Sequence, residues 1–143
     1  MKKYDIYLAA PFFTEKELTI YRKVVKTLRE NGYEVFVPQE HEVEGGRSMT
    51  NQDWAYNVFN MDILGLADCE CLVCLNFGMY SDSGTAWEVG FAKGHDMKVV
   101  QILCGDENTV YSLMMLNGSD IICDLMNIDL DRTTVDLRKV VQK

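Results

Sequence analysis

The chain has 143 residues, 48% of them hydrophobic and 25% charged, which is ordinary for a globular protein and predicts a single domain over residues 1–143. Its net charge of −8 gives no general attraction for polymeric nucleic acid or acidic membranes, so a nucleic-acid-related ligand is expected to be small. The sequence has neither an apolar run of membrane-spanning length nor a signal-peptide pattern, and we therefore expect a cytoplasmic protein.

The first predicted elements are a strand, a helix and a second strand. Residues 4–10, which are apolar apart from Asp5, are typical of a buried strand. Thr14 and Glu17 have the spacing of a capping box, and apolar residues then recur at helical spacing until Gly32 ends the segment. Residues 33–37 predict the second strand, which a proline closes.

The middle of the chain predicts a loop, a long helix and a central strand. The loop covers the polar residues 39–49. The helix covers about residues 51–67 and places four apolar side chains on one face: Trp54, Val58, Met61 and Leu64. Residues 69–75 predict the central strand, and their apolar run over 71–75 is as expected for a parallel sheet that is covered on both faces.

The last part of the chain continues the alternation of helices and strands. After a loop at 78–82 comes a helix that contains Glu88, followed by a strand over 98–103, a short helix near 110–116 and a strand near 121–123. This order predicts an α/β sandwich with a five-stranded parallel sheet. The ligand site of such a sheet is expected outside the carboxyl ends of its strands.

The five cysteines are an odd number, which disfavours a closed set of disulfides. Cys69, Cys71 and Cys74 are close enough in sequence to suggest a metal site. On a strand, however, the first two share one face and the third points to the other. Because no second Cys/His cluster completes four ligands, we favour buried core thiols and expect no metal.

Several common sites are excluded by missing motifs. The chain has no glycine-rich dinucleotide or P-loop motif and no nucleophile elbow. Its two histidines fit ordinary roles. His95 lies at a helix end, where a positive charge on its ring would interact favourably with the helix dipole. His41 lies between two glutamates in a loop, where we expect it to be solvated at the surface.

Glu88 is the residue that most strongly indicates chemistry. It lies between Trp87 and Val89, and burying it as an ion is costly because desolvation disfavours the charged form. The alternative is an exposed glutamate on the outer face of the helix. Tyr7 and Asp82 lie near strand ends, and carboxylates beside a phenol suit attack at an acetal-like carbon.

Three stretches of the chain together resemble the nucleoside 2-deoxyribosyltransferase family. They are Ile6-Tyr7 with Ala-Ala-Pro-Phe-Phe at 9–13, Asn60-Met61-Asp62 with Ala67-Asp68, and Asp-Ser-Gly-Thr-Ala-Trp-Glu-Val-Gly-Phe-Ala at 82–92. The resemblance covers most of the chain, in order and in register. It implies a flavodoxin-like three-layer α/β sandwich that self-associates, with active sites shared between subunits.

The resemblance also implies a mechanism without a metal or organic cofactor. Glu88 would attack C1′ of a 2′-deoxynucleoside and form a covalent ester, from which an incoming base takes the sugar with retained configuration. Tyr7 would orient Glu88, while Asp62 and Asp82 would contact base and sugar, one of them supplying the proton for the leaving base.

Further residues are implied as substrate contacts. Within the matching motifs these are Phe12, Phe13 and Gly84; Glu42 aligns near a base-contacting glutamine of the family; Ser112 and Met114 replace an Asn-x-Met motif that a neighbouring subunit contributes. Because a carboxylate accepts hydrogen bonds and donates none unless protonated, Glu42 implies a changed base preference.

The alternatives concern whether a base or water cleaves the ester, and whether the substrate is a nucleoside or its 5′-monophosphate. Ser112 and the nearby cation Arg47 leave open a hydrolase that cleaves 2′-deoxynucleosides or their 5′-monophosphates. Against a phosphate, the first loop lacks the serine and arginine that related glycosidases use. A non-catalytic nucleoside-binding domain is the third alternative, and purine or pyrimidine preference stays open.

Overall fold

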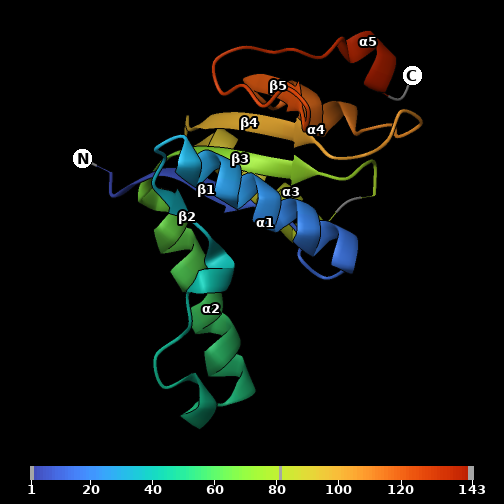
Figure 1. Cartoon of the computed structure of the whole chain (residues 1–143). Helices are drawn as coiled ribbons and strands as arrows, with labels where there is room; N and C mark the ends of the chain where they lie inside the picture. Colours follow the sequence, from blue (N-terminus) through green and yellow to red (C-terminus); the bar gives the residue numbers. More distant parts are fainter. Residues whose placement is uncertain (1, 81, 142–143) are drawn as a thin grey trace.

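A parallel sheet with helices on both faces forms the centre of the molecule (Figure 1). The computed structural model describes residues 2–80 and 82–141. Within those residues the sheet has five strands in the order β2-β1-β3-β4-β5, all parallel. They are β1 (Tyr4–Ala9), β2 (Val35–Phe36), β3 (Cys69–Asn76), β4 (Lys98–Leu103) and β5 (Ile121–Asp124). This order confirms the predicted flavodoxin-like fold and puts the switch point between β1 and β3.

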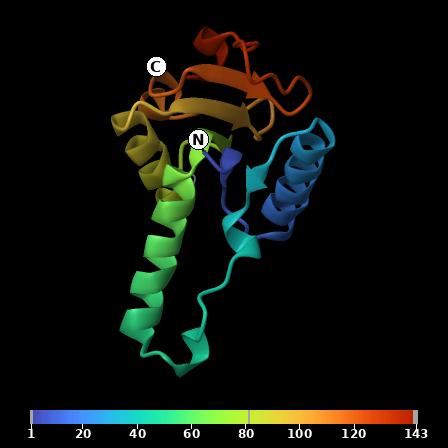
Figure 2. The same cartoon turned by 90° about the vertical axis from the view of Figure 1, so that its left-hand side faces the viewer.

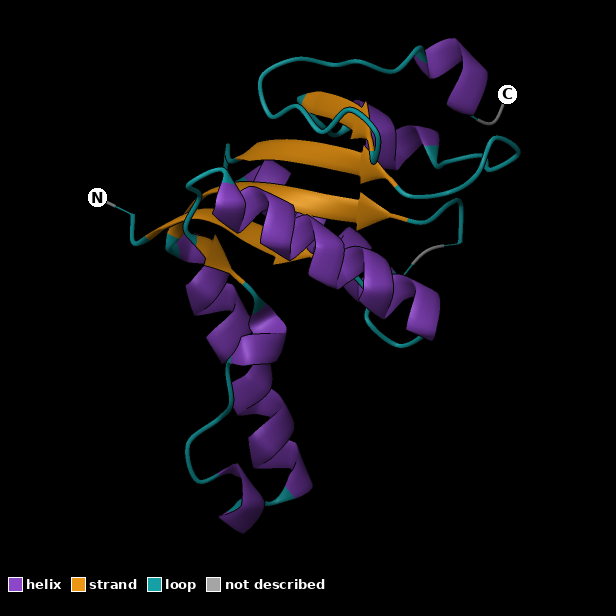
Figure 3. Cartoon of the chain, in the orientation of Figure 1, coloured by secondary structure: helices purple, strands orange, loops and turns teal. Residues whose placement is uncertain are grey.

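The helices divide between the two faces of the sheet (Figures 2 and 3). They are α1 (Glu15–Glu30), α2 (Asn51–Ala67), α3 (Ser83–Gly94), α4 (Leu113–Asn117) and α5 (Leu137–Val140). Helix α1 begins with the predicted capping box of Thr14 and Glu17. It covers one face, and α2 and α3 lie on the other, which completes the three layers.

Two buried clusters hold these layers together. On the α1 side, Tyr21, Val24 and Leu28 pack against strand residues such as Ile6 and Val73. On the other side, a cluster forms from Tyr7, Phe36, Leu66, Leu72, Cys74 and Val89. Alternate residues of the central strands thus feed opposite cores, as expected for a sheet covered on both faces.

One expectation about the cysteines is wrong. Cys69 and Cys71 do not share a face, because Cys69 begins β3 and packs in the α2–α3 cluster, where its thiol contacts the carbonyl of Gly65 at 3.1 Å. Cys71 packs on the α1 side. All five thiols are buried. In the part of the chain that the structure describes, no group of three or more His, Cys, Asp or Glu is arranged to hold a metal.

Helix α2 projects away from the sheet and contacts it only near its carboxyl end (Figure 2). Gly65 and Leu66 are buried there, whereas Trp54 and Leu64 are 49% and 70% exposed. The apolar face predicted for this helix therefore does not enter the core. Three of the four residues predicted to form this apolar face line a cleft instead: Trp54, Val58 and Met61.

The remaining differences concern element lengths. Strand β2 has two residues rather than the predicted 33–37, because it is an edge strand that pairs with β1 at only two positions. Helix α4 begins at Leu113, after the cap Ser112, and the tail forms the one-turn helix α5. Over the described ranges, no helix has the length and apolarity needed to cross a membrane.

Candidate active site

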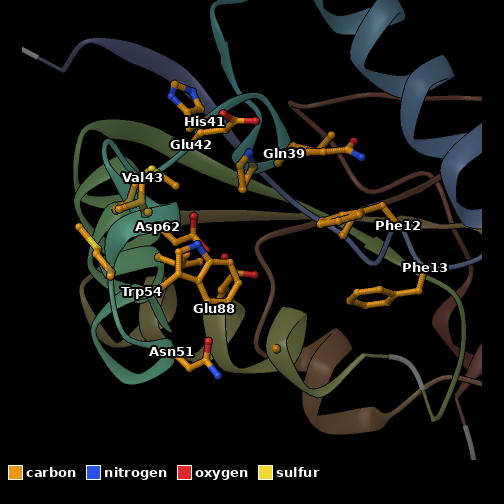
Figure 4. Close-up of a pocket in the computed structure, with 18 of the residues that line it drawn as sticks. Phe12, Phe13, Gln39, His41, Glu42, Val43, Asn51, Trp54, Asp62 and Glu88 are labelled. Carbon is orange, nitrogen blue, oxygen red and sulfur yellow. The ribbon is translucent and has the colours of Figure 1, made fainter. Parts of the chain in front are cut away.

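A cleft of about 950 Å³ opens beside the carboxyl ends of β1 and β2, a size typical of ligand sites. Its walls come from the loop after β1, the loop of residues 38–49, helix α2 and the start of α3. Figure 4 shows Phe12 and Phe13 on one side and Trp54, Asp62 and His41 on the other. Arg47 also lines the cleft.

Glu88 lines this cleft, whereas its partner Tyr7 does not line it and lies in the core. Tyr7 is fully buried in β1, and its hydroxyl donates a hydrogen bond to Oε2 of Glu88. Glu88 lies in the second turn of α3, whose first turn is capped by Asp82. The cap fixes where α3 begins, and this brings Glu88 over the strand that carries Tyr7.

The environment of Glu88 favours its protonated form more than water does. Burial raises the pKa of Glu88 to about 7, the hydrogen bond from Tyr7 opposes this, and the charges of Asp62 and Asp82 add to it. Burial and the neighbouring Glu88 raise the pKa of Tyr7, so Tyr7 remains a donor. The pair thus holds a carboxylate that titrates near neutral pH in a partly desolvated site.

Asp62 lies in the cleft although its helix ends at the opposite edge of the sheet from the expected site. The cleft extends over the face between α2 and α3, so a residue five positions before the end of α2 reaches it. Burial raises the pKa of Asp62, and the charge of His41 lowers it. The burial of Asp62 therefore favours its protonated form.

Asp82 has a structural task as well as a place in the cleft. Its Oδ2 accepts hydrogen bonds from the backbone N–H of Thr85 at 2.8 Å and from the Thr85 hydroxyl at 2.9 Å. Gly84 lines the cleft next to it, and a Cβ there would lie 3.2 Å from Asp82 Oδ2. Both residues thus combine the cap of α3 with the wall of the cleft.

The predicted substrate contacts divide into two groups. Phe12, Phe13 and Glu42 line the cleft, and the two phenylalanine rings stack with centroids 5.3 Å apart. Ser112 and Met114 are not part of its lining. Ser112 caps α4, with its hydroxyl 3.4 Å from the backbone nitrogen of Met115, and Met114 is 80% exposed.

Sequence reasoning missed several residues of the cleft, above all His41. The histidine is not a solvated loop residue: it is half-buried, lines the cleft and stacks on Phe36 at 4.1 Å. The available signal was its position just beyond β2, where ligands of such sheets bind. Gln39 and Asn51 are further polar groups in the wall. His95 lies at a helix end as expected, at the position that caps the carboxyl end of α3.

Tyr21 is a buried group with an unusual environment. Its ring is 2% exposed and lines the same cleft from α1. In the described residues its hydroxyl has no hydrogen-bond partner, although the backbone of Gln39 lies nearby. Burial raises the pKa of Tyr21, so this hydroxyl stays protonated.

A flavodoxin-like sheet with carboxylates gathered in a cleft near its switch point defines an α/β protein built to bind and process a small molecule. The family model described as nucleoside 2-deoxyribosyltransferase matches residues 6–136. The chain belongs to this family, which acts on small-molecule nucleosides and nucleobases.

Solved structures support the assignment. The chain is similar to the 2-deoxyribosyltransferase from Bacillus psychrosaccharolyticus, with 28% identity over 97% of both chains and a TM-score of 0.72. A 2-desoxiribosyltransferase from Leishmania mexicana is 21% identical, with 81% of this chain and 72% of that one covered and a TM-score of 0.54. The CMP N-glycosidase from Clostridium botulinum is 18% identical over 85% and 87%, also with a TM-score of 0.54.

The last two likenesses concern the fold alone. A search of curated protein sequences finds no significant match. Taken together, the family and its structural neighbours support an enzyme of the nucleoside deoxyribosyltransferase type, acting in glycosyl transfer or N-glycoside cleavage.

Proposed function

We propose that this protein transfers 2-deoxyribose between nucleobases by double displacement, with Glu88 as the nucleophile. The observation that carries the proposal is the part-buried hydrogen bond from Tyr7 to Glu88, a carboxylate that lines the cleft. A hydroxyl that donates to one carboxylate oxygen orients the carboxylate and leaves its other oxygen for attack. Nothing else in the cleft combines burial, orientation and a carboxylate in this way among the described residues.

In the first half of the reaction, Glu88 attacks C1′ as the bond from C1′ to the base nitrogen breaks. The leaving base takes a proton from Asp62, whose raised pKa suits a general acid. In the second half an incoming base attacks C1′ from the side the first base left, the ester bond breaks, and the new base gives its proton to the Asp62 carboxylate, which restores the acid. Two displacements at one carbon retain the β configuration.

The missing 2′-hydroxyl of the substrate assists both steps, because an oxocarbenium-like transition state forms more easily without that electron-withdrawing group. The reaction needs no cofactor, since a carboxylate, an acid and a phenol supply the nucleophile, the proton and the orientation.

We further propose that the sites are completed between subunits. Apolar side chains are exposed on the side of the sheet covered by α2, α3 and α4: Tyr56, Phe59, Trp87, Leu113 and Met114. The ring centroids of Phe59 in α2 and Trp87 in α3 lie 5.4 Å apart, so the two helices present one continuous apolar surface. Ser112 and Met114, which stand outside their own chain's cleft, would then reach the cleft of a neighbour.

A second candidate is hydrolysis of a 2′-deoxynucleoside 5′-monophosphate on the same scaffold. The observation that favours it is Arg47, a cation in the wall of the cleft that matches an anionic group. Water would then resolve the ester in place of a base.

The test is a matrix of 2′-deoxynucleosides and their 5′-monophosphates, each with and without an acceptor base. With 2′-deoxyinosine and adenine, a purine transferase yields 2′-deoxyadenosine. Free base alone, with or without acceptor, would favour the hydrolase. Glu88→Ala should lower turnover by roughly 10⁴-fold or more, whereas Glu107→Ala, in an exposed loop outside the cleft, should leave it unchanged.

A further inference from the structure

Two amide side chains are fully buried in the sheet, next to each other. Asn76 is the last residue of β3, and Gln101 lies in the neighbouring strand β4. Asn76 Nδ2 donates a hydrogen bond to Gln101 Oε1 at 3.1 Å. Burying an amide is unfavourable unless its polar atoms are paired, and apolar side chains could fill the same space without that requirement. Packing of the core alone therefore does not explain the pair.

The other polar atoms of the pair bind to two segments outside the sheet. Asn76 Oδ1 accepts a hydrogen bond from the backbone N–H of Gly78 at 3.0 Å, in the loop after β3. Gln101 Nε2 donates a hydrogen bond to the carbonyl of Met115 at 3.3 Å, in α4. A continuous series of hydrogen bonds thus joins this loop, the two strands and α4.

The hydrogen bond from Gln101 gives direction to the way α4 is anchored. The helix has only five residues, too few to be stable without tertiary contacts. Its buried residue Leu116 packs in a cluster with Leu103 of β4 and Ile122 of β5, but hydrophobic contacts are not directional. The bond to Met115, one residue earlier, is directional. Together these contacts fix how α4 is rotated against the sheet.

The orientation of α4 matters because its first turn faces away from its own cleft. Ser112 caps the helix, and the side chains of Leu113 and Met114 are exposed. None of these three residues lines the cleft of its own chain. In the proposed function, Ser112 and Met114 complete the cleft of a neighbouring subunit.

We propose that Asn76 and Gln101 are positioning residues for the substrate site of the neighbouring subunit. The pair holds α4 against the sheet, and α4 in turn places Ser112 and Met114 beside the neighbour's substrate. This rests on the proposed function, since it requires clefts that are completed between subunits. Because neither amide touches substrate or Glu88, loss of the pair should weaken substrate binding and leave the chemical step largely unchanged.

The first test variant is Gln101→Met, which keeps the length of the side chain and removes its hydrogen bonds. The carbonyl of Met115 retains a partner, because it also accepts a hydrogen bond from the Ser119 hydroxyl at 2.9 Å. We expect KM for a 2′-deoxynucleoside to rise roughly 10-fold, with kcat within about twofold of the wild-type value. Partial unfolding would instead lower kcat, since fewer molecules would be active, and leave KM unchanged.

A double variant guards against a loss of stability from one unpaired amide. In Asn76→Leu/Gln101→Met both amides are absent, so neither is left buried without its partner. The same rise in KM is expected. The matched control is Ile102→Val, at the next position of β4, whose buried side chain packs on the α1 side. This control should lower stability in urea slightly without changing KM. An unchanged KM in both amide variants would overturn the proposal.

Mixed oligomers test whether the pair acts on the neighbour. Gln101→Met retains Glu88 but misplaces α4, whereas Glu88→Ala lacks the nucleophile and retains a correctly placed α4. In co-expressed oligomers, a cleft that contains Glu88 from the first variant can be completed by α4 of the second. With substrate far below KM, random pairing should make the mixture roughly fivefold more active than the sum of the two variants assayed separately.

The outcomes separate this proposal from the one on which it rests. No gain in the mixed oligomers would overturn it, because Gln101 would then act within its own subunit. Failure of the wild-type protein to cleave any 2′-deoxynucleoside, with or without an acceptor base, would instead overturn the proposed function.

Discussion

At the scale of single residues, Glu88 combines two properties that oppose each other. In the proposed reaction its partial burial would limit the access of water to the ester, but the same burial disfavours the ionised form that would attack C1′. Tyr7 moderates this conflict, because its hydrogen bond stabilises the carboxylate. The charges of Asp62 and Asp82 instead raise the pKa of Glu88. Because that pKa is about 7, part of the Glu88 carboxyl is ionised at neutral pH.

We predict from this balance how activity depends on pH. Because the proposed nucleophile is the ionised form of Glu88 and the pKa of Glu88 is raised to about 7, kcat/KM should rise with pH up to about 7 and then level off on that limb. Tyr7→Phe removes the interaction that lowers this pKa, so the limb should move to higher pH. The measurement is kcat/KM between about pH 5 and pH 9. A limb that stays in place in Tyr7→Phe would contradict this role of Tyr7.

A second prediction concerns Tyr21, whose hydroxyl is buried without a partner in the part of the chain described. Tyr21→Phe should raise the free energy of unfolding by about 1 kcal/mol, because it removes an unsatisfied buried polar group. The matched control is Tyr111→Phe, which should lower the free energy of unfolding. The Tyr111 hydroxyl accepts a hydrogen bond from the backbone N–H of Gly105 at 2.8 Å, and this variant removes it. Urea denaturation measures both, and a destabilised Tyr21→Phe would show that its hydroxyl is paired.

At the scale of elements, helix α2 packs closely on β2, where the backbone of Gly65 lies against the ring of Phe36. Gly65→Ala should destabilise the protein by about 1–3 kcal/mol, because the added methyl group overlaps the Phe36 ring. Gly90→Ala in α3 is the control: nothing lies within 4 Å of its Cβ position, so the better helix propensity of alanine should stabilise the protein slightly. Equal stability of the two variants in urea would contradict the tight contact.

The elements also show how far the sequence could predict the structure. Helix α1 was predictable from its capping box, and β3 from its continuous apolar run, because both signals are local. The role of α2 was not, since the spacing of Trp54, Val58 and Met61 marks an apolar face without saying whether core or cleft lies opposite. His41 was misjudged because stacking on Phe36 depends on the tertiary fold.

At the scale of the whole molecule, the exposed apolar side of α2, α3 and α4 predicts self-association. Met114→Glu should lower the oligomeric state seen by sedimentation and reduce activity, because it puts a charge on the proposed contact. Met126→Glu is the control, since Met126 is 86% exposed but follows β5, away from these helices. A monomeric wild-type protein with full activity would contradict sites shared between subunits.

The central claim is that Glu88 carries the sugar between the two half-reactions. Its most direct test is to mix the protein with a 2′-deoxynucleoside without acceptor, quench the reaction and locate any added mass by peptide mass spectrometry. We expect a 2-deoxyribosyl group on the peptide that contains Glu88, and its loss when an acceptor base is added before the quench. An adduct on another residue, or turnover without any adduct in a rapid quench, would contradict it.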